Sequence, residues 1–315
     1  MNITLCIVLL LGFYIVFIRS HKNCKSCRRR SVVNTYNEEY SKLYDTVWYD
    51  RARYKGEVRY ISKNIGIDNP TRILDLGCGT GNHLKLWKDK WPSSNVKGMD
   101  LSLDQISKAR EKHPDVEITH GSYLNSNIWE KNSFDLILCM YDASQYTDDV
   151  DTVFQNIYKW LKPGGVYVFH GIDPRRIEDG CDETASTNSL PVKPDRKGHC
   201  NVLYPGFVYS SWWSKSIFSN WVRYNETFYK TEGNGWPRDW DVSKKVEDNV
   251  PIGMKVDTKT QGLMTNGHRL FLLTPSQMVH RGKQAGFIRA DINPSNGITN
   301  IHDQGSEEYF IFFKK

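Results

Sequence analysis

The sequence has no surplus of charge of either sign once residues 1–30 are set aside. Those residues hold six of the 42 lysines and arginines and no acid, so the other 36 basic residues balance the 36 acidic residues of the chain. A protein that binds nucleic acid usually carries a basic surplus that faces the phosphates. We therefore expect no nucleic-acid partner.

Cysteine is also scarce, with seven residues scattered along the chain. A disulfide-rich secreted protein usually has an even number of cysteines in a regular framework, and seven irregularly spaced cysteines do not fit this pattern. Cys24 and Cys27 form a CxxC pair. No second CxxC pair accompanies them, so we expect no metal site. Two interpretations of the pair stay open: palmitoylated cysteines beside a membrane, or unmodified thiols.

Long apolar runs are absent except at the N-terminus, where residues 3–18 are apolar apart from three positions. As a helix this run is about 24 Å long, slightly short of a hydrocarbon core of ~30 Å. A cleaved signal peptide would need a basic start and small residues at its end, and the run has neither. The sequence therefore predicts one N-terminal transmembrane helix at residues 1–19, followed by a basic juxtamembrane linker at residues 20–33.

The basic residues follow the apolar run rather than precede it. Positive charge beside a membrane span favours the cytosolic side. We therefore expect a single-pass membrane protein, anchored through residues 1–19, whose catalytic or binding domain at residues 34–315 lies in the cytosol.

From residue 36 onward, short apolar strands alternate with helices whose apolar positions recur at helical spacing. Such alternation predicts an α/β fold, with a parallel sheet covered by helices on both faces. The expected strands are residues 72–76, 96–100, 116–119, 134–140 and 166–170, and the expected helices are residues 36–49, 52–64, 82–90, 103–112 and 150–161.

A glycine-rich loop, GCGTG at residues 77–81, separates the first expected strand from the helix that follows. Taken alone, this loop is as consistent with a tight turn as with a ligand site. Asp100 ends the second strand, 19 residues past Gly81. A carboxylate in that place can hydrogen-bond ribose hydroxyls while the glycines let the backbone approach the ligand. Together they predict an adenosine-containing ligand at the carboxyl ends of these strands.

Three motifs, in order, resemble those of the class I S-adenosylmethionine-dependent methyltransferases. ILDLGCGTG at residues 73–81 is similar to their first motif, GMDLS at 98–102 to their second-strand motif, and LKPGG at 161–165 to the turn before their fifth strand. The resemblance implies a Rossmann-like α/β fold with a doubly wound, mostly parallel seven-stranded sheet. It also implies that S-adenosyl-L-methionine is the cofactor.

The resemblance further implies roles for individual residues. The glycines would bring the backbone close to the amino-acid part of the cofactor, the acid before them would face its ammonium, and the acid of the second strand would hold the ribose diol. Tyr36, Tyr40 and Tyr44 resemble a tyrosine-rich helix that covers the cofactor in this family, with plain packing as the alternative. The cofactor-binding residues expected on this basis are Asp75, Gly77, Gly79, Gly81, Asp100, Ser122 and Met140.

Methyl transfer asks little of protein side chains, because the hard chemistry belongs to the cofactor. An amine acceptor needs only to be neutral, whereas a hydroxyl acceptor needs a base within reach. The candidate catalytic residues are His170, at the end of the fifth strand, and Asp142 and Tyr141, just after the fourth. A structural hydrogen bond is the alternative for His170, and plain packing is the alternative for Tyr141.

Nearly a hundred residues, 174–269, separate the fifth strand from the next expected helix, where the family fold has a short connection. The insert begins with a polar, loop-like stretch and then becomes rich in aromatic residues, which predicts an antiparallel β-rich cap over the rim of the site. Trp212, Trp213 and Trp221 are the candidate substrate-binding residues, because sugar rings pack on aromatic faces. The alternative is that they form the core of the cap.

The sequence thus predicts an enzyme, an S-adenosylmethionine-dependent methyltransferase that acts at a membrane on a small acceptor such as a sugar or an amine. Two alternatives stay open. One is a membrane-tethered scaffold that binds the cofactor without turnover, and the other is a methyltransferase that acts on lipid or protein. The residue pattern does not choose the acceptor atom.

Overall fold

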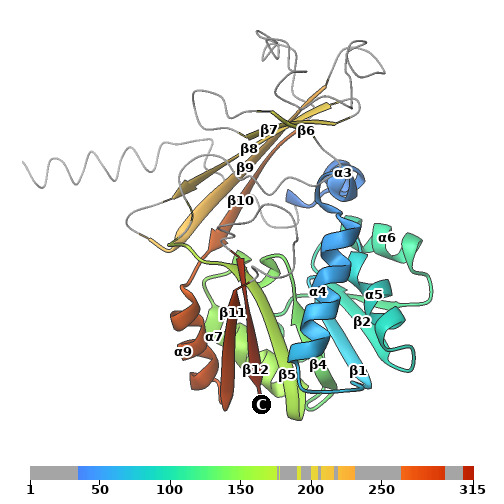
Figure 1. Cartoon of the computed structure of the whole chain (residues 1–315), viewed down its shortest axis with the longest axis vertical. Coiled ribbons are helices and arrows are strands. Elements are labelled where there is room, and N and C mark those ends of the chain that lie inside the picture. Colours follow the sequence, from blue (N-terminus) through green and yellow to red (C-terminus); the bar gives the residue numbers. More distant parts are fainter. Residues whose placement is uncertain are drawn as a thin grey trace, which may run out of the picture. The chain divides into compact units, whose positions relative to one another are not determined.

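The structure is a computed structural model of the whole chain, and within residues 35–315 it contains two β-sheets with their covering helices (Figure 1). The residues that it describes are 35–175, 177, 190–192, 200–204, 207–215, 219–230, 264–294 and 308–315.

The first sheet is the mostly parallel sheet that the sequence predicted. Its seven strands are β1 (Arg72–Leu76), β2 (Asn95–Asp100), β3 (Glu117–His120), β4 (Phe134–Cys139), β5 (Leu161–Ile172), β11 (Arg289–Pro294) and β12 (Glu308–Lys314). They lie in the order β11-β12-β5-β4-β1-β2-β3. The five strands β1 to β5 run parallel, whereas β12 is antiparallel to both β5 and β11. A mixed α/β fold with a seven-stranded sheet is therefore confirmed.

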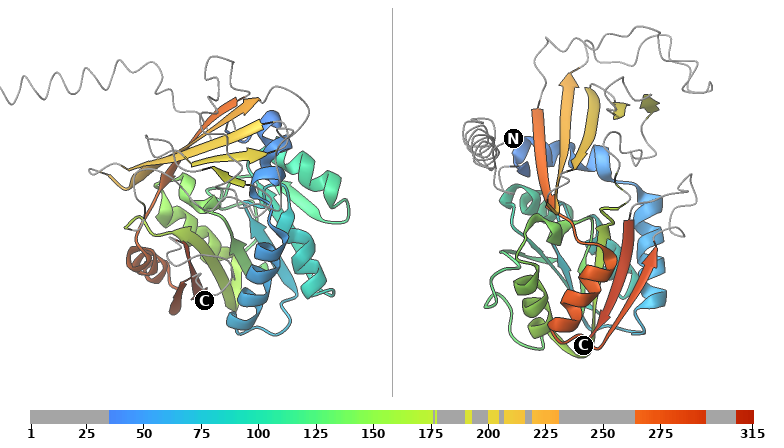
Figure 2. Two further views of the ribbon diagram at one scale, coloured as in Figure 1. Left: turned by 45° about the horizontal axis from the view of Figure 1, so that its top comes forward. Right: turned by 90° about the vertical axis from the view of Figure 1, so that its left-hand side faces the viewer.

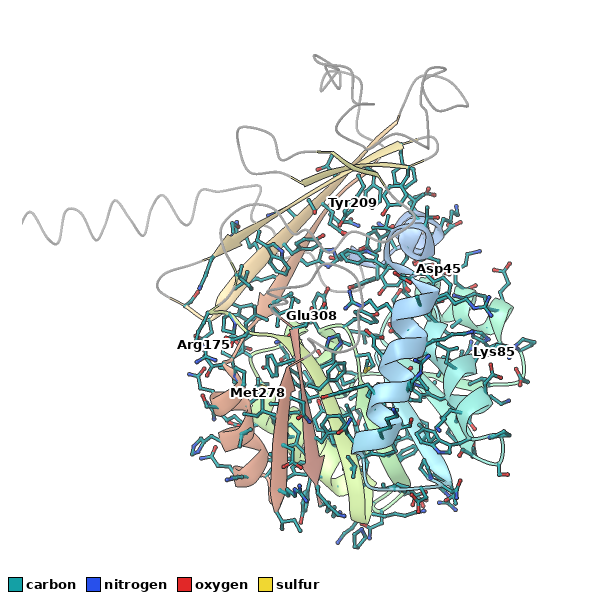
Figure 3. All side chains as sticks on the ribbon, in the orientation of Figure 1. Asp45, Lys85, Arg175, Tyr209, Met278 and Glu308 are labelled. Carbon is teal, nitrogen blue, oxygen red and sulfur yellow. The ribbon has the colours of Figure 1, made fainter. Side chains whose placement is uncertain are left out.

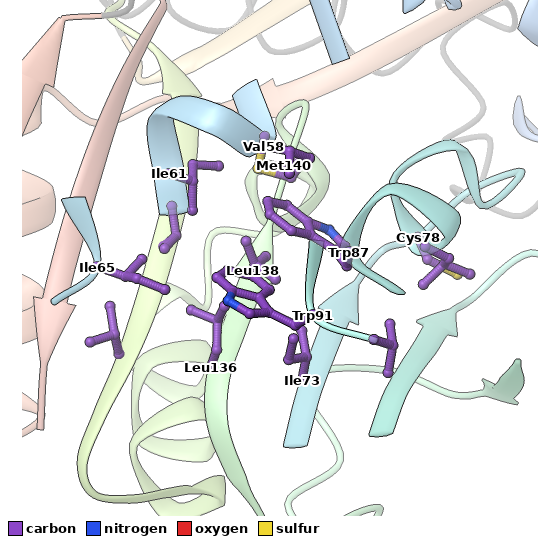
Figure 4. Close-up of a cluster of buried hydrophobic side chains, with 14 of the residues drawn as sticks. Val58, Ile61, Ile65, Ile73, Cys78, Trp87, Trp91, Leu136, Leu138 and Met140 are labelled. Carbon is purple, nitrogen blue, oxygen red and sulfur yellow. The ribbon is translucent and has the colours of Figure 1, made fainter. Parts of the chain in front are cut away.

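Successive side chains of the central strands point to opposite faces of this sheet. Ile73 and Leu136 belong to an apolar layer under α4, α5 and α6, part of which is shown in Figure 4. Their neighbours Leu74 and Ile137 belong to a second layer under α7 and α9. Because both faces are covered, the strands read as continuous apolar runs. The helices are α3 (Glu38–Trp48), α4 (Arg51–Asn64), α5 (Asn82–Lys90), α6 (Leu103–Lys112), the 3-10 helix η2 (Ala143–Tyr146), α7 (Val150–Trp160) and α9 (Pro275–Gln284).

The predicted fold class needs one correction, which concerns the N-terminal transmembrane helix. In the part of the chain that the structure describes, no helix is long and apolar enough to cross a membrane. The longest described helix, α4, has 14 residues, and six of them are charged. A membrane span needs about 20 predominantly apolar residues. The apolar run at residues 1–19 and the basic segment at residues 20–33 lie outside the described residues.

The second sheet lies in the insert and is antiparallel, as the sequence predicted. Its strands are β6 (Leu190–Val192), β7 (Cys200–Tyr204), β8 (Phe207–Lys215), β9 (Trp221–Lys230) and β10 (Met264–Phe271). They lie in the order β10-β9-β8-β7-β6, and Figure 2 shows the long strands side by side. The division of the domain at residues 174–269 stays a prediction.

Helix α3 packs against this second sheet. Tyr40 and Val47 of the helix are buried together with Tyr204, Tyr209 and Phe228 of the sheet. The Asn37 side chain caps the helix by accepting a hydrogen bond from the Tyr40 backbone N–H. The helix therefore presents one face to the insert, which leaves another face for the carboxyl edge of the first sheet.

Candidate functional site

A cavity lies at the carboxyl ends of β1, β2 and β4, with one wall formed by α3 and the residues before it. Its volume is about 870 Å³, counting the space at its open mouth. Ligands of open parallel sheets bind beyond these strand ends. Six of the seven residues predicted to bind the cofactor line it, namely Asp75, Gly77, Gly79, Asp100, Ser122 and Met140.

The glycine loop forms the floor of this cavity by adopting a backbone that other residues rarely tolerate. Gly77, Gly79 and Gly81 all have positive φ, at 76°, 54° and 81°. A Cβ on Gly77 would lie 2.4 Å from the Cβ of Ala143, so the loop passes close to the chain after β4. Gly81 does not line the cavity, but starts α5 as its N-cap residue.

Asp100 fixes the loop from the end of β2. One oxygen of its carboxylate accepts a hydrogen bond from the Gly79 N–H at 2.8 Å, and the other accepts from the Ser102 N–H at 2.8 Å. Burial raises the pKa of this carboxyl, although these backbone donors work in the opposite direction. A carboxylate held at the end of the second strand is the group that binds a ribose diol in nucleotide-binding sheets.

Two further buried polar groups of the cavity wall fit the same kind of ligand. Gln105 is 1% exposed, and its Oε1 has no hydrogen-bond partner among the described residues, whereas its Nε2 donates to the Ser41 hydroxyl. A buried acceptor without a partner is costly unless a ligand satisfies it. Asp75 is 2% exposed, and burial, together with the charge of Asp100 and against that of His83, raises its pKa to about 6. The residues present therefore fit a ligand with hydroxyl or amino donors and a cationic group.

Side-chain hydrogen bonds hold α3 beside the cavity. The Asp45 carboxylate, labelled in Figure 3, accepts from Thr80 Oγ1 at 2.5 Å and from Asn82 Nδ2 at 2.9 Å. The Ser102 hydroxyl donates to the backbone carbonyl of Tyr36 at 2.5 Å. Tyr36 and Tyr44 line the cavity, whereas Tyr40 is buried against the second sheet. The tyrosine-rich segment thus faces both the cavity and the insert.

Tyr141 lines the cavity on the side of β4, with its backbone at a positive φ of 49°. Its hydroxyl donates to the Glu57 carboxylate at 2.9 Å, and its backbone N–H donates to His170 Nδ1 at 3.2 Å. The guanidinium of Arg53 lies 4.8 Å from the centre of its ring. These contacts fix the position of Tyr141 and occupy its hydroxyl.

The structure does not bring His170 or Asp142 to the cavity wall. His170 is 2% exposed and stacks on Phe310 with ring centres 4.4 Å apart. Its Nδ1 accepts a hydrogen bond from the Tyr141 N–H. This is the structural hydrogen bond that the sequence analysis gave as the alternative to a catalytic role for His170. Asp142 follows Tyr141 with φ of 60° and marks the start of η2.

The predicted substrate tryptophans belong to strands of the second sheet, and the side chains of Trp213 and Trp221 are not among the described residues that line the cavity. Trp213 is 6% exposed and packs with Val222, Tyr224 and Leu270. Trp221 lies beside Phe271 and under the guanidinium of Arg269. Trp212 pairs with Asn225 through its backbone, and its side chain lies outside the described residues.

Sequence reasoning missed a buried acid and histidine of the second sheet. Glu226 is 0% exposed and His268 is 4% exposed, and they face each other across β9 and β10, joined by a hydrogen bond. His268 also hydrogen-bonds the hydroxyl of Tyr146, a residue of the cavity wall. The sequence carries a signal for the buried acid. Glu226 lies two residues from both Tyr224 and Phe228, so the three share one face of β9, and an acid is unexpected among these aromatic residues.

Residues 73–165 match a family model described as a methyltransferase domain. A dTDP-3-amino-3,6-dideoxy-alpha-D-glucopyranose N,N-dimethyltransferase from Streptomyces fradiae is 27% identical over 139 residues, which are 42% of this chain and 53% of that protein. A trans-aconitate 2-methyltransferase from Rhodopseudomonas palustris (strain BisA53) is 36% identical over 131 residues, or 41% and 46% of the two chains. The chain spans about half the length of the curated relatives it matches.

Solved structures resemble a larger part of the chain. DesVI from Streptomyces venezuelae has a TM-score of 0.60 at 18% sequence identity, and the match covers 87% of this chain and 97% of that one. The S-adenosylmethionine-bound amino pentose methyltransferase CalS10 from Micromonospora echinaspora has a TM-score of 0.58 at 18% identity, covering 89% and 98%. At these identities the similarity shows a shared fold.

Proposed function

We propose that this protein methylates a small-molecule acceptor, an amine or a sugar. The cofactor is S-adenosylmethionine, bound by the class I, Rossmann-like methyltransferase domain that includes residues 73–165. The observation that carries the proposal is the convergence of Asp75, the glycine loop and Asp100 on one cavity, which is also lined by tyrosine hydroxyls. The first three groups fit the cofactor, and the tyrosines stand where an acceptor would be recognised.

Different residues of the cavity would bind different parts of the cofactor. Asp100 and Gln105 would accept hydrogen bonds from hydroxyl or amino groups, Asp75 would pair with the ammonium, and Gly77 and Gly79 would let the backbone approach. When bound, the cofactor supplies an electrophilic methyl group. The role of the protein is then to orient the acceptor and exclude water, which can supply much of the rate.

The names of relatives support a small acceptor. Several are aminosugar N,N-dimethyltransferases, from Streptomyces fradiae and Saccharopolyspora spinosa among others. Others are named for trans-aconitate, which is also a small molecule. We favour the amine or sugar because the described residues that line the cavity include three uncharged phenols, Tyr36, Tyr44 and Tyr146. They include no lysine or arginine, the residues that would pair with a tricarboxylate.

The proposal is tested by incubating the full-length protein with methyl-labelled S-adenosylmethionine and a panel of aminosugar nucleotides, free amines and sugars. We expect label in one class of small molecule and an equal amount of demethylated cofactor. Cofactor binding without label in any product would support the scaffold alternative instead. In parallel incubations with lipid or with protein in place of the panel, label in either one would move the acceptor to that class.

The variant Asp100→Ala tests where the cofactor binds. It removes a charged partner of the ribose and of the Gly79 N–H, so we expect cofactor binding weaker by about 1.5–3 kcal/mol. The measurement is calorimetric titration with the cofactor. Unchanged affinity in Asp100→Ala would contradict this placement of the cofactor.

The raised pKa of Asp75, about 6, predicts how cofactor affinity depends on pH. Only the ionised carboxylate attracts an ammonium, so below pH 6 binding must first expel a proton. Affinity should fall up to tenfold for each unit that the pH drops below about 6. The variant Asp75→Asn should bind the cofactor weakly, and its cofactor affinity should change little with pH. Asp115→Asn, a change at an exposed acid that pairs with Lys88, should keep the wild-type profile. A wild-type affinity that is flat from pH 5 to pH 7 would contradict the prediction.

A further inference from the structure

We propose that Tyr36, Tyr146 and His268 form a relay that removes a proton from the acceptor, with Glu226 orienting the histidine. This inference rests on the proposed function and adds a role for the insert. Strands β9 and β10 of the insert supply Glu226 and His268, the two buried residues behind the tyrosines. Both tyrosines line the cavity, whereas His268 and Glu226 lie behind them. His170 and Asp142, the bases expected from the sequence, do not line it.

The relay is a continuous chain of short contacts. The hydroxyls of Tyr36 and Tyr146 are 2.7 Å apart, and the hydroxyl of Tyr146 is 2.7 Å from His268 Nδ1. His268 Nε2 lies 2.5 Å from Glu226 Oε2. Every separation is within the range of a strong hydrogen bond. The chain joins the segment before α3, the turn after β4 and two strands of the insert.

The direction of each hydrogen bond follows from the buried acid. The other oxygen of Glu226 accepts from the hydroxyls of Tyr40 and Tyr209, at 3.1 and 2.7 Å. A carboxylate with these partners is an acceptor only, so His268 must donate to it from Nε2. In a neutral imidazole, Nδ1 is then the acceptor and Tyr146 must donate to it.

The same reasoning extends to the cavity. Because Tyr146 donates to His268, its oxygen accepts the hydrogen of Tyr36. The hydrogen of Tyr36 is therefore turned away from the cavity, and its oxygen is left as an acceptor. An acceptor oxygen at the cavity wall suits a ligand that arrives with an N–H or O–H group.

The phenols act as conductors of the proton rather than as its final base. Burial raises the pKa of Tyr36 and Tyr146 well above the usual range of a phenol, so both hydroxyls keep their hydrogens. Among the described residues, the titratable groups that face His268 are Glu226 and the phenols of Tyr36, Tyr40, Tyr146 and Tyr224. The Glu226 carboxylate thus lies beside the histidine that completes the relay, where it can pair with the imidazolium once that has formed.

The proton balance is as follows. As the acceptor nitrogen or oxygen gains its methyl group, its N–H or O–H bond breaks and a new O–H bond forms on Tyr36. The original hydrogen of Tyr36 passes to Tyr146, and that of Tyr146 passes to His268 Nδ1. The histidine becomes an imidazolium whose Nε2–H still donates to Glu226. The proton returns to solvent by the reverse path after the methylated product leaves.

The test compares two variants, each of which lacks one tyrosine hydroxyl near the buried pair Glu226 and His268. Tyr146→Phe cuts the relay between Tyr36 and His268, whereas Tyr209→Phe removes a donor to Glu226 that lies outside it. With an acceptor identified in the labelling assay, Tyr146→Phe should lower kcat/KM for that acceptor by about 100-fold or more. The cofactor Kd should not change. Tyr209→Phe should stay within about threefold of the wild type.

The pH profile separates a relay from a packing effect. Wild-type kcat/KM should rise with pH and then level off, because the relay takes a proton from the acceptor only while its last nitrogen can accept one. In Tyr146→Phe this inflection should vanish, and the rate should keep rising as the acceptor itself loses its proton to solvent. If both variants lose activity equally and keep the wild-type profile, the cluster is structural and the relay is overturned.

A second readout does not depend on turnover. In the full-length protein without ligand, nitrogen NMR of labelled histidines should show His268 as the neutral form with its hydrogen on Nε2, and Tyr146→Phe should shift Nδ1 specifically. A hydrogen on Nδ1 would overturn the relay even if methyl transfer is established. The predicted tautomer with no methylated product in any assay would instead count against the proposed function.

Discussion

Replacing Gly77 by alanine should reduce affinity for S-adenosylmethionine at least 100-fold while the protein stays folded. Two effects act at this one position. The φ of 76° is strained for any residue with a Cβ, at a cost of about 1–2 kcal/mol. The added Cβ would also lie 2.4 Å from the Cβ of Ala143, so the loop or the turn after β4 must move. Either movement displaces the cavity floor, and calorimetric titration measures the loss.

Gly164→Ala is the matched control. Gly164 has the same φ of 76°, but an added Cβ would find nothing within 4 Å, and the residue does not line the cavity. It should cost a similar strain energy in stability and leave cofactor affinity unchanged. If Gly77→Ala bound the cofactor as tightly as Gly164→Ala does, the glycine loop would not be part of the cofactor site.

The cofactor half of the site could be predicted from the sequence because its parts lie close together in the chain. Gly77, Gly79 and Asp100 stand at fixed offsets from the ends of two neighbouring strands, and the parallel sheet brings those ends to one edge. The same local logic predicted the two apolar layers, since strands covered on both faces read as continuous apolar runs.

The acceptor half could not be predicted in this way. Tyr36, Tyr146, Glu226 and His268 come from four separate elements, and only the packing of the insert against α3 and η2 brings them together. His170 shows the opposite case. Its place at the end of β5 suggests a site residue, but its Nδ1 is occupied by the Tyr141 N–H. Long-range contacts decide which of the two buried histidines hydrogen-bonds a tyrosine hydroxyl of the cavity wall, and local patterns do not encode such contacts.

The other large expected effect concerns the buried carboxylate behind Tyr141. Glu57 of α4 is 2% exposed and accepts from three side chains. Arg53 Nε lies 3.1 Å from one oxygen, His83 Nε2 lies 2.9 Å from the other, and the Tyr141 hydroxyl donates at 2.9 Å. Arg53 also pairs with Glu308 of β12. The carboxylate thus links α4, α5 and the turn after β4, and through Arg53 it is also connected to the first residue of β12.

Glu57→Ala should therefore destabilise the protein by about 3 kcal/mol, measured by urea unfolding at pH 7. Removing one partner of a buried ion pair typically costs about 3–5 kcal/mol, because the remaining groups stay buried without their partner. The low end applies here because Arg53 keeps Glu308. Glu111→Ala is the control. Glu111 is an exposed acid that pairs with Lys108 three residues away, so the unfolding midpoint should not move.

The pH dependence of this difference follows from the pKa of Glu57. Burial raises that pKa, but the hydrogen bond from His83 and the charges of Arg53, His83 and His170 outweigh it, so the folded-state value lies below the usual 4.5. A depressed pKa contributes stability that is present above the unfolded value and is lost as the pH falls through the folded value. The gap between wild type and Glu57→Ala should thus be full at pH 7 and narrow below pH 4.5. A gap that stays constant into acid would mean that Glu57 stabilises the fold by packing rather than by charge.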